Sequence, residues 1–557
     1  MGALLAVFIA LILTLANSAN FLSGVMGTRP GEVYLGTTHY YEDYFLYLNQ
    51  FFQGAHGGWL TLNRYTSEST PASILFWPNI LLGKLGGALG LSPEISYNLS
   101  VMLLSFAVLI MISSLVAHTF PKDKIKTLMG FLFATLATSL INHIWVNGNP
   151  MWYPFQLWKT PNFALDRLGG VPHQLVQTLL FLLAMHAWFF LRPKKIPALL
   201  SLLVSLASLV LLSTLNPVMS AIFLGALWVT QIMMLPKQKT SWVILFVTSI
   251  GVSATVWYYN LISGEPPHNL SKLWEAGQQI TTTPLFMLLS IGPISIIGFI
   301  GALSVFKRAR PIELFSIVLL IACYALYFSP IPKLIGISNS RVLFPAMYAA
   351  WGILGVVGLE TIASLLVIPA LGARIQNFIN WILGSLHFGG QASPRMTMNK
   401  TFLTVLLSLL FFLVSLPTLK WELGQKLAVK PEERIPLLYL TTDVYQAFTY
   451  LRTAGSFDDI VLANPASHMD AILPALSGHT GYTGHPFATI NNEQKKAGAM
   501  KFFQLKMTAI EAKEWLKTNN IRYVLFTQFD GDIKRFWLGL PFLKIIFTNS
   551  HATALES

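Results

Sequence analysis

Two adjacent carboxylates, Glu42 and Asp43, follow the first hydrophobic segment of the chain, beside His39 and several tyrosines. A helix over residues 42–51 would place Asp43, Tyr47 and Gln50 on one face through their i, i+4, i+7 spacing. A carboxylate within hydrogen-bond reach of a substrate proton acts as a general base and supplies about 10²–10⁴-fold in rate. Alternatively, the pair solvates the loop or begins its helix, where acids suit the helix dipole. From the residues alone, both interpretations stay open.

A second candidate acid is Asp166, which precedes Arg167 in a loop rich in tryptophan and tyrosine. Asp166 could join Asp43 around a divalent cation, Mg²⁺ or Mn²⁺, because hard cations prefer oxygen ligands. An ion pair between Asp166 and Arg167 is the simpler alternative. His173 follows closely and is a weaker candidate for the site, since it equally fits a hydrogen-bonded residue at a helix entrance.

Cations that could hold a phosphate flank one loop near the tenth apolar segment. Lys333 and Arg341 bracket a Gly- and Ser-containing stretch, and an arginine there can bind phosphate bidentately while its stem lies in apolar surroundings. The alternative is an interface residue whose side chain extends to the membrane surface. Arg64 is a weaker phosphate candidate.

Glycines punctuate residues 478–486 near the C-terminus, around His479 and His485. Glycine permits close backbone approach or positive φ, so either histidine could face a sugar. The stretch is not a phosphate loop, because no Gly-Lys-Ser/Thr follows it. We expect a structural turn, or a cover over the membrane domain, rather than a catalytic element.

The composition indicates a membrane protein. Hydrophobic residues make up 54% of the 557 residues and charged residues 11%, whereas soluble domains carry about 25% charged residues. About eleven apolar runs are long enough to be spans: Ala3–Leu22, Ile95–Ala117, Leu128–Leu140, Val171–Leu191, Ile196–Leu212, Val218–Leu235, Trp242–Leu261, Pro284–Phe306, Ile312–Phe328, Val342–Leu359 and Phe402–Leu416. The single cysteine, Cys323, excludes a disulfide framework and a cysteine metal site within one chain.

Loop charges predict the orientation. The net charge of +13 comes from lysines and arginines in short loops between apolar runs, which is the pattern of topology determinants and not of a nucleic-acid module. With the N-terminus inside, every predicted inside loop is basic, and the first span reads as an uncleaved anchor. The count of eleven spans requires Pro71–Leu89 to be an interfacial or re-entrant hairpin and Ala373–Leu386 to be a helix lying flat on the membrane.

The predicted fold is therefore mainly α: a polytopic helical bundle over residues 1–419, N-in and C-out, with a long first external loop at 26–94. Residues 420–557 have a soluble composition and predict a small extracytoplasmic α/β domain. Its expected elements are strands at Asp459–Ala463, Ile521–Phe526 and Phe542–Thr548 and a helix at Thr508–Lys517 with Ile510, Trp515 and Leu516 facing inward.

Several strings resemble the GT-C superfamily of polytopic membrane glycosyltransferases, in particular bacterial members. They touch both ends of the chain, whereas the middle spans match only in hydrophobicity and loop charge. The strings are Tyr41-Glu42-Asp43-Tyr44-Phe45-Leu46-Tyr47-Leu48, Gly58-Trp59-Leu60, Asn63-Arg64-Tyr65-Thr66, Leu82-Gly83-Lys84-Leu85, Val461-Leu462-Ala463-Asn464-Pro465, Ile472-Leu473-Pro474-Ala475-Leu476-Ser477-Gly478 and Ile521-Arg522-Tyr523-Val524-Leu525-Phe526.

The resemblance implies an inverting transferase that moves a hexosyl or pentosyl group from a polyprenyl-phosphate donor to an envelope glycan, lipid or protein. The reaction would occur on the extracytoplasmic face of the inner membrane. The resemblance maps the acid/base onto Asp43, with Glu42 as its neighbour, and the donor-phosphate ligands onto Arg341 and Lys333. Some members add a second external-loop acid and a divalent metal; Asp166 is the match here, but the absence of Asp-x-Asp leaves the cofactor open.

Two alternatives come from other classes of protein. A transporter or flippase of lipids or small solutes would favour ionisable residues deep within spans, and the predicted spans are almost free of them. A non-catalytic membrane protein with an external binding domain also remains compatible with the sequence. A catalytic site at the external surface accounts for more of the observations than either alternative.

Overall fold

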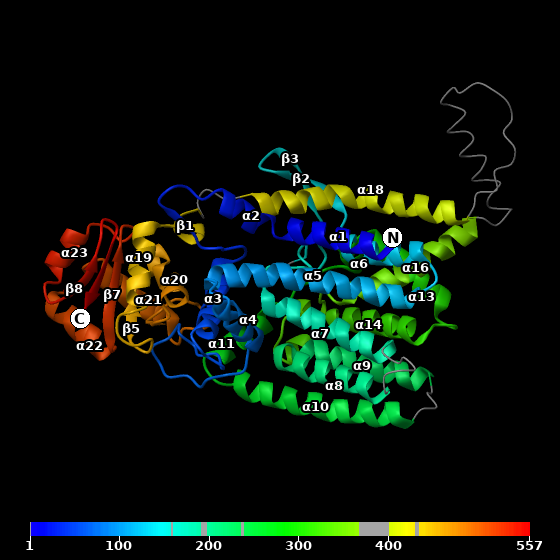
Figure 1. Cartoon of the computed structure of the whole chain (residues 1–557), viewed down its shortest axis with the longest axis horizontal. Coiled ribbons are helices and arrows are strands. Elements are labelled where there is room, and N and C mark those ends of the chain that lie inside the picture. The colour runs from blue at the N-terminus through cyan, green and yellow to red at the C-terminus, as the bar shows by residue number, and fades with distance from the viewer. Residues whose placement is uncertain (1, 158–159, 191–197, 235–238, 367–399, 429–433) are drawn as a thin grey trace, which may run out of the picture.

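The computed structural model describes residues 2–157, 160–190, 198–234, 239–366, 400–428 and 434–557. Long helices pack side by side in a bundle, and the C-terminal residues form a smaller domain at one end of it (Figure 1). We call residues 434–557 the tail domain. The predicted flat helix Ala373–Leu386 lies outside the described residues.

The predicted apolar runs all overlap helices or bent pairs of helices. The bundle comprises α1 (Gly2–Asn17), α2 (Ala19–Met26), α5 (Pro93–Thr119), α6 (Lys124–Leu136), α7 (Pro172–Phe189), α8 (Ala198–Leu215), α9 (Pro217–Met234), α10 (Lys239–Ser263), α12 (Pro284–Ile291), α13 (Pro293–Val305), α14 (Pro311–Tyr327), α16 (Met347–Leu366) and α18 (Lys400–Leu427). A short hairpin of β2 (Ile141–Val146) and β3 (Asn149–Pro154) follows α6.

Length and hydropathy make five of the described helices long and apolar enough to cross a membrane. The number rises to seven if two bent pairs each count as one span. These pairs are α1 with α2, bent by 56°, and α12 with α13, bent by 101°. The helical bundle is thus confirmed, and the total of about eleven spans stays a prediction.

Charged side chains from the basic loops meet at the end of the bundle away from the tail domain. Lys126 pairs with Glu360 at 2.7 Å, at the start of α6 and near the end of α16. Arg310 donates to the carbonyl of Thr119, the last residue of α5, at 2.6 Å. Helix α5 begins at the opposite end, where Ser92 caps it by accepting a hydrogen bond from the backbone. This segregation fits the charge pattern, while the sidedness in the membrane remains a prediction.

Two helices at the junction of bundle and tail domain are locked by close backbone contact (Figure 1). They are α3 (Tyr41–Ala55) and α4 (Trp77–Ala88). A Cβ on Gly54 would lie 2.2 Å from the carbonyl oxygen of Ile80, and one on Gly83 only 2.3 Å from that of Phe51. The predicted hairpin at Pro71–Leu89 is wrong, because Pro78 falls in the first turn of α4 and is tolerated there.

The tail domain is α/β and carries a five-stranded sheet in the order β6-β5-β7-β9-β8. The sheet strands are β5 (Ile460–Leu462), β6 (Thr480–Gly481), β7 (Ile521–Thr527), β8 (Lys544–Thr548) and β9 (Ala552–Glu556). The helices are α19 (Thr442–Leu451), α20 (Met469–Ser477), α21 (Asn492–Phe503), α22 (Ala509–Thr518) and α23 (Ile533–Gly539). The predicted strands and helix are present. Ile510 is not inward as predicted but 78% exposed, whereas Leu516 is buried.

A strand from the first loop joins the tail domain to the bundle. Strand β1 (Glu32–Tyr34) pairs antiparallel with β4 (Tyr439–Thr441). Helix α18 also runs through residue 419, the predicted domain boundary, and ends at Leu427. The residues between the first and third helices are therefore held from two sides, by the bundle and by the tail domain.

Candidate functional site

Asp43 lies in the first turn of α3, at the junction of bundle and tail domain. Its side chain is 47% exposed, and its Oδ1 is 3.5 Å from Nε2 of His485 in the tail domain. Its negative charge also acts on His39 and on His173, which begins α7. The predicted helix is confirmed, and the N-terminal position favours a charged carboxylate. Asp43 is thus an accessible acid at a meeting point of distant segments.

Glu42 differs from Asp43 in its surroundings. Its carboxylate accepts hydrogen bonds from the hydroxyls of Tyr40, at 2.8 Å, and Tyr41, at 3.2 Å. The Tyr41 hydroxyl also lies 3.3 Å from Nδ1 of His468 in the tail domain. Glu42 is therefore engaged by tyrosine hydroxyls at the start of α3, whereas Asp43 faces His485 of the tail domain.

His39 is neutral at ordinary pH. Burial lowers its pKa to about 4, and the nearby Asp43 only partly opposes this effect. Nε2 of His39 lies 2.8 Å from the hydroxyl oxygen of Tyr97, which itself donates to the carbonyl of Gly170 at 3.0 Å. Because a hydroxyl has one proton to donate, the imidazole must carry its proton on Nε2 and donate to Tyr97. His39 thus links the loop before α3 to α5.

The predicted face of α3 converges on His173. The Tyr47 ring packs edge-on against the His173 ring, with centroids 4.7 Å apart. One turn further, Gln50 accepts a hydrogen bond at 2.7 Å from Asn79, whose side-chain nitrogen is 3.3 Å from Nδ1 of His173. His173 is buried, with 3% of its surface exposed. The structure thus places His173 beside the face that carries Asp43, as a hydrogen-bonded residue at the entrance of α7.

Arg341 reaches the same region from the other side. It lies in a 3-10 turn, η1 (Asn339–Val342), and its Nε donates to Glu275 of helix α11 (His268–Gly277) at 3.0 Å. Its side chain is 43% exposed. Burial raises the pKa of the Tyr47 hydroxyl, the charge of Asp43 raises it further and the charge of Arg341 lowers it, so both charges act on this hydroxyl. Lys333, in the short helix α15 (Ile331–Leu334), is exposed on the neighbouring loop.

A segment of the tail domain, residues 482–489, lies over this region, and we call it the cover loop. The ring of Phe487 packs against Trp274 of α11, with centroids 5.1 Å apart. Thr489 donates to the carbonyl of Tyr65 in the first loop at 2.6 Å. The cover loop therefore connects Asp43, through His485, with the helix that holds Glu275.

Arg64 ties the first loop to the tail domain. Its Nη1 donates to the carbonyl of Phe457 at 3.0 Å and to Thr480 at 3.1 Å, and it pairs with Asp458. These contacts engage the guanidinium in holding two parts of the chain together. A role of Arg64 in phosphate binding stays a prediction that these contacts do not support.

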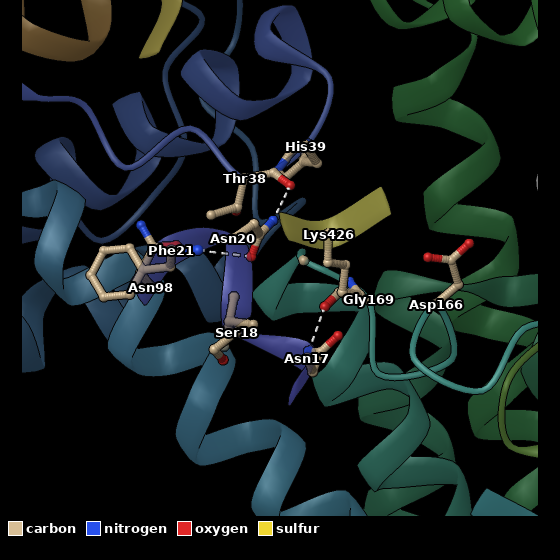
Figure 2. A pocket seen from close by; sticks show the side chains of 12 residues that line it. Asn17, Ser18, Asn20, Phe21, Thr38, His39, Asn98, Asp166, Gly169 and Lys426 are labelled. Atoms are coloured by element: carbon tan, nitrogen blue, oxygen red, sulfur yellow. Dashed lines mark hydrogen bonds between the residues drawn. The ribbon is translucent and has the colours of Figure 1, made fainter. Parts of the chain in front are cut away.

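Asp166 and His39 both line a pocket of about 110 Å³, and their side chains lie apart from each other in it (Figure 2). Asn17 and Lys426 line the same pocket. The Asp166 carboxylate is exposed, while its backbone N–H donates to Glu422 of α18 at 2.9 Å. The pocket and the surroundings of Asp43 share His39.

Arg167 turns into the bundle. Its Nη2 donates to the carbonyls of Thr135, at 2.8 Å, and Ala137, at 2.5 Å. Its guanidinium carbon lies 3.9 Å from the centre of the Tyr348 ring. Only 5% of Arg167 is exposed. Arg167 therefore fastens the loop that carries Asp166 to the bundle, through hydrogen bonds from its side chain to backbone carbonyls.

The described residues do not supply a metal donor set. Within them, no group of three or more His, Cys, Asp or Glu side chains lies close enough to hold an ion. A divalent cation shared by Asp43 and Asp166 stays a prediction, and we derive no step through it.

Three residues of this region were not predicted from the sequence: Glu275, Trp274 and Phe487. The sequence offered only a weak signal for Glu275: it is an acid in a chain with few acids, and it lies between two predicted spans, Trp242–Leu261 and Pro284–Phe306. His485 was noted in its glycine-rich stretch, but as part of a cover. The structure shows such a cover and brings His485 to Asp43.

No family model matches the sequence, and no curated protein sequence matches it either. Solved structures do match. The oligosaccharyltransferase AglB from Archaeoglobus fulgidus, in complex with an inhibitory peptide and a dolichol-phosphate, aligns at a TM-score of 0.54 and 11% identity, covering 97% of this chain and 71% of AglB. AglB tethered to an acceptor peptide with the NVT sequon aligns at a TM-score of 0.51 and 12% identity, covering 94% and 69%.

The arabinofuranosyltransferase AftD from Mycobacteria aligns at a TM-score of 0.52 and 14% identity, over 100% of this chain but only 39% of AftD. The chain thus has the fold of the GT-C membrane glycosyltransferases, and the resemblance expected from the sequence is confirmed at the level of fold.

Proposed function

We propose that this chain is a membrane glycosyltransferase that moves a sugar from a polyprenyl-phosphate donor to an envelope glycan, lipid or protein. The observation that carries the proposal is an accessible acid, Asp43, at the junction of bundle and tail domain, linked through the cover loop and α11 to a cation, Arg341. Transfer from a lipid phosphate needs both, a base for the acceptor hydroxyl and a positive group for the departing phosphate.

The reaction follows from this arrangement. Asp43 removes the proton of an acceptor hydroxyl, and the oxygen attacks the anomeric carbon of the donor sugar. The new carbon–oxygen bond forms as the bond to the lipid phosphate breaks, with inversion at that carbon. The phosphate leaves with the bonding electrons, and Arg341 stabilises its charge by a charge-assisted hydrogen bond.

The donor class is supported by the fold and by the position of the site. AglB, with the same fold, has been solved with a dolichol-phosphate. Here Asp43 and Arg341 lie at one end of the helical bundle, under the tail domain, where a lipid held between helices would present its headgroup (Figure 1). We place this end on the extracytoplasmic face of the inner membrane, because Lys126 and Arg310, from two of the basic loops, lie at the other end.

Glu275 constrains how the donor phosphate would bind. It accepts hydrogen bonds from Arg341 and thus occupies the position a phosphate would take. Donor binding must displace or share this carboxylate. Helix α11, which carries it, has no fully buried residue, and its Trp274 packs against Phe487 of the cover loop.

The test is sugar transfer by the purified protein. It would be incubated with labelled polyprenyl-phosphate sugars and crude envelope acceptors, comparing the wild type with Asp43→Asn and, as the matched control, Glu42→Gln. We expect transfer that Asp43→Asn abolishes and Glu42→Gln largely keeps. Equal turnover by wild type and Asp43→Asn would remove Asp43 from the mechanism.

A further inference from the structure

We propose that His485 of the tail domain is a positioning residue for Asp43: its Nε2–H points at the Asp43 carboxylate and holds it in the orientation needed to take the acceptor proton. This inference deepens the proposed function and rests on it. It makes the site a composite, in which the bundle supplies the base and the tail domain supplies the group that orients the base.

The hydrogen bonds of the imidazole settle which nitrogen carries the proton. Nδ1 of His485 accepts from the backbone N–H groups of Phe487 and Ala488, both at 3.1 Å. A nitrogen that accepts two hydrogen bonds has no proton of its own, so in the neutral ring the proton lies on Nε2. Nε2 is the atom 3.5 Å from Oδ1 of Asp43. The loop backbone therefore makes His485 a donor toward the acid.

The ring is held rigidly. Its side chain is 5% exposed and packs between the rings of Tyr65 and Phe487, at centroid distances of 6.2 and 6.1 Å. Its backbone N–H donates to Thr489 at 3.2 Å. Just before it, a Cβ on Gly484 would lie 2.5 Å from the carbonyl oxygen of Asp470, so only glycine allows this approach. A donor fixed in this way orients a carboxylate without losing further side-chain freedom.

The first loop anchors the cover loop in place. Gly481 donates its N–H to the carbonyl of Arg64 at 2.8 Å, and Ile490 donates its N–H to the hydroxyl of Thr66 at 3.1 Å. Together with the bond from Thr489 to Tyr65, these contacts flank His485 on both sides along the chain. The distance from His485 to Asp43 thus depends on the tail domain staying docked on the first loop.

The separation of 3.5 Å is long for a hydrogen bond, and catalytic hydrogen bonds often tighten only in the complex with substrate. Other groups share the field of Asp43, and a pH profile must be read with them in mind. They are His39, Tyr40 and Tyr47 from its own loop and helix, Tyr97 from α5 and His173 from α7. These five groups belong to the first loop and the bundle, whereas His485 belongs to the tail domain.

The contact can be tested without any activity. In a Cys323→Ala background, Asp43→Cys and His485→Cys would be treated with a short bifunctional thiol reagent, and linked peptides identified by mass spectrometry. The control pairs Asp43→Cys with Ile510→Cys, on the exposed face of α22 at the outer end of the tail domain (Figure 1). We expect linkage in the first pair only. No linkage in a folded first pair overturns the inference.

The positioning role needs kinetics. We expect His485→Ala to lower kcat about 10–100-fold, as expected for loss of a hydrogen bond to a charged group, with KM little changed. The acid limb of the pH profile should move to higher pH, because Asp43 loses a donor that favours its charged form. His485→Gln should recover part of kcat, and the control His551→Ala, an exposed histidine paired with Asp443, should behave like wild type.

The outcomes separate the two proposals. An unchanged kcat and pH profile in folded His485→Ala overturns the positioning role while the transferase proposal stands. If the wild type transfers no sugar although the first cysteine pair is linked, the proposed function fails and the positioning role fails with it. The linkage would then report a docking contact alone.

Discussion

Two segments of this protein each present an accessible aspartate, and they differ in what surrounds the acid. Asp43 lies where α3, α7, α11 and the tail domain meet, with aromatic rings and histidines as neighbours. Asp166 lines a pocket, and its loop is fastened by Arg167 and Glu422 to backbone groups. The residue type and sequence position of an acid therefore indicate a candidate functional site less well than the number of distant segments that converge on it.

The largest expected effect tests directly whether Asp43 and Asp166 differ in their contribution to catalysis. Asp43→Asn keeps the shape of the side chain but removes the base, so we expect kcat for sugar transfer to fall about 10²–10⁴-fold. Asp166→Asn should change kcat less than about threefold, as for an exposed residue outside the site. Initial rates with one labelled donor measure both variants. Similar losses in the two would show that both loops take part in the chemistry.

The cation beside the site gives the next effect. Arg341→Gln should raise KM for the lipid-phosphate donor about 10–100-fold, since a charge-assisted contact to phosphate is lost. Glu275→Gln should lower this KM, because the carboxylate that occupies Arg341 is neutralised. Lys517→Gln, an exposed lysine on α22 of the tail domain, is the matched control. A rise in KM with Glu275→Gln would mean that the ion pair preorganises the arginine instead of competing with the donor.

For the loop that carries Asp166 and Arg167, we predict that a substitution changes the stability of the fold. Arg167→Met leaves the carbonyls of Thr135 and Ala137 without their donor, which should destabilise the fold by about 1–3 kcal/mol. Thermal unfolding in detergent at a fixed scan rate would show it as a lower transition temperature, with Asp166→Asn as the control. A transition temperature equal to that of wild type would contradict the structural role of Arg167.

The smallest expected effect concerns His39 and pH. Burial lowers its pKa from 6.5 to about 4, so between these values the unfolded chain binds a proton that the folded chain does not. Stability should therefore fall as pH drops through this window, and not further below about 4 on this account. The pH dependence of the unfolding temperature should be flatter in His39→Gln, and an unchanged slope would refute the assignment.

Much of the fold was predictable from the sequence, because local signals specify it. Spanning length marks the helices, Ser92 marks the start of α5, and the apolar runs of the tail domain mark its strands. The errors arose where local patterns mislead. Ile510 fits an inward helical position yet lies exposed, and the segment Pro71–Leu89, expected to be a hairpin, contains the helix α4.

The candidate site was predictable only in part. Asp43 was identifiable because its helix, its face and its position after the first span are local features. The ion pair of Arg341 with Glu275, and the approach of His485, depend on how remote segments pack, which no spacing in the sequence encodes. The contacts of Arg64 were unpredictable for the same reason, since its partners Phe457 and Thr480 lie far along the chain.

The bonds between the start of α3 and the tail domain have a consequence for biosynthesis. Tyr41 and its partner His468 are 427 residues apart in the sequence. At about 5–20 residues per second, the ribosome needs roughly 20–90 s to make the chain between them. During that interval the nascent bundle has its acidic helix in place but not the segment that covers it. The newly made protein is thus expected to gain function in a single late step, when the tail domain folds onto a bundle already assembled.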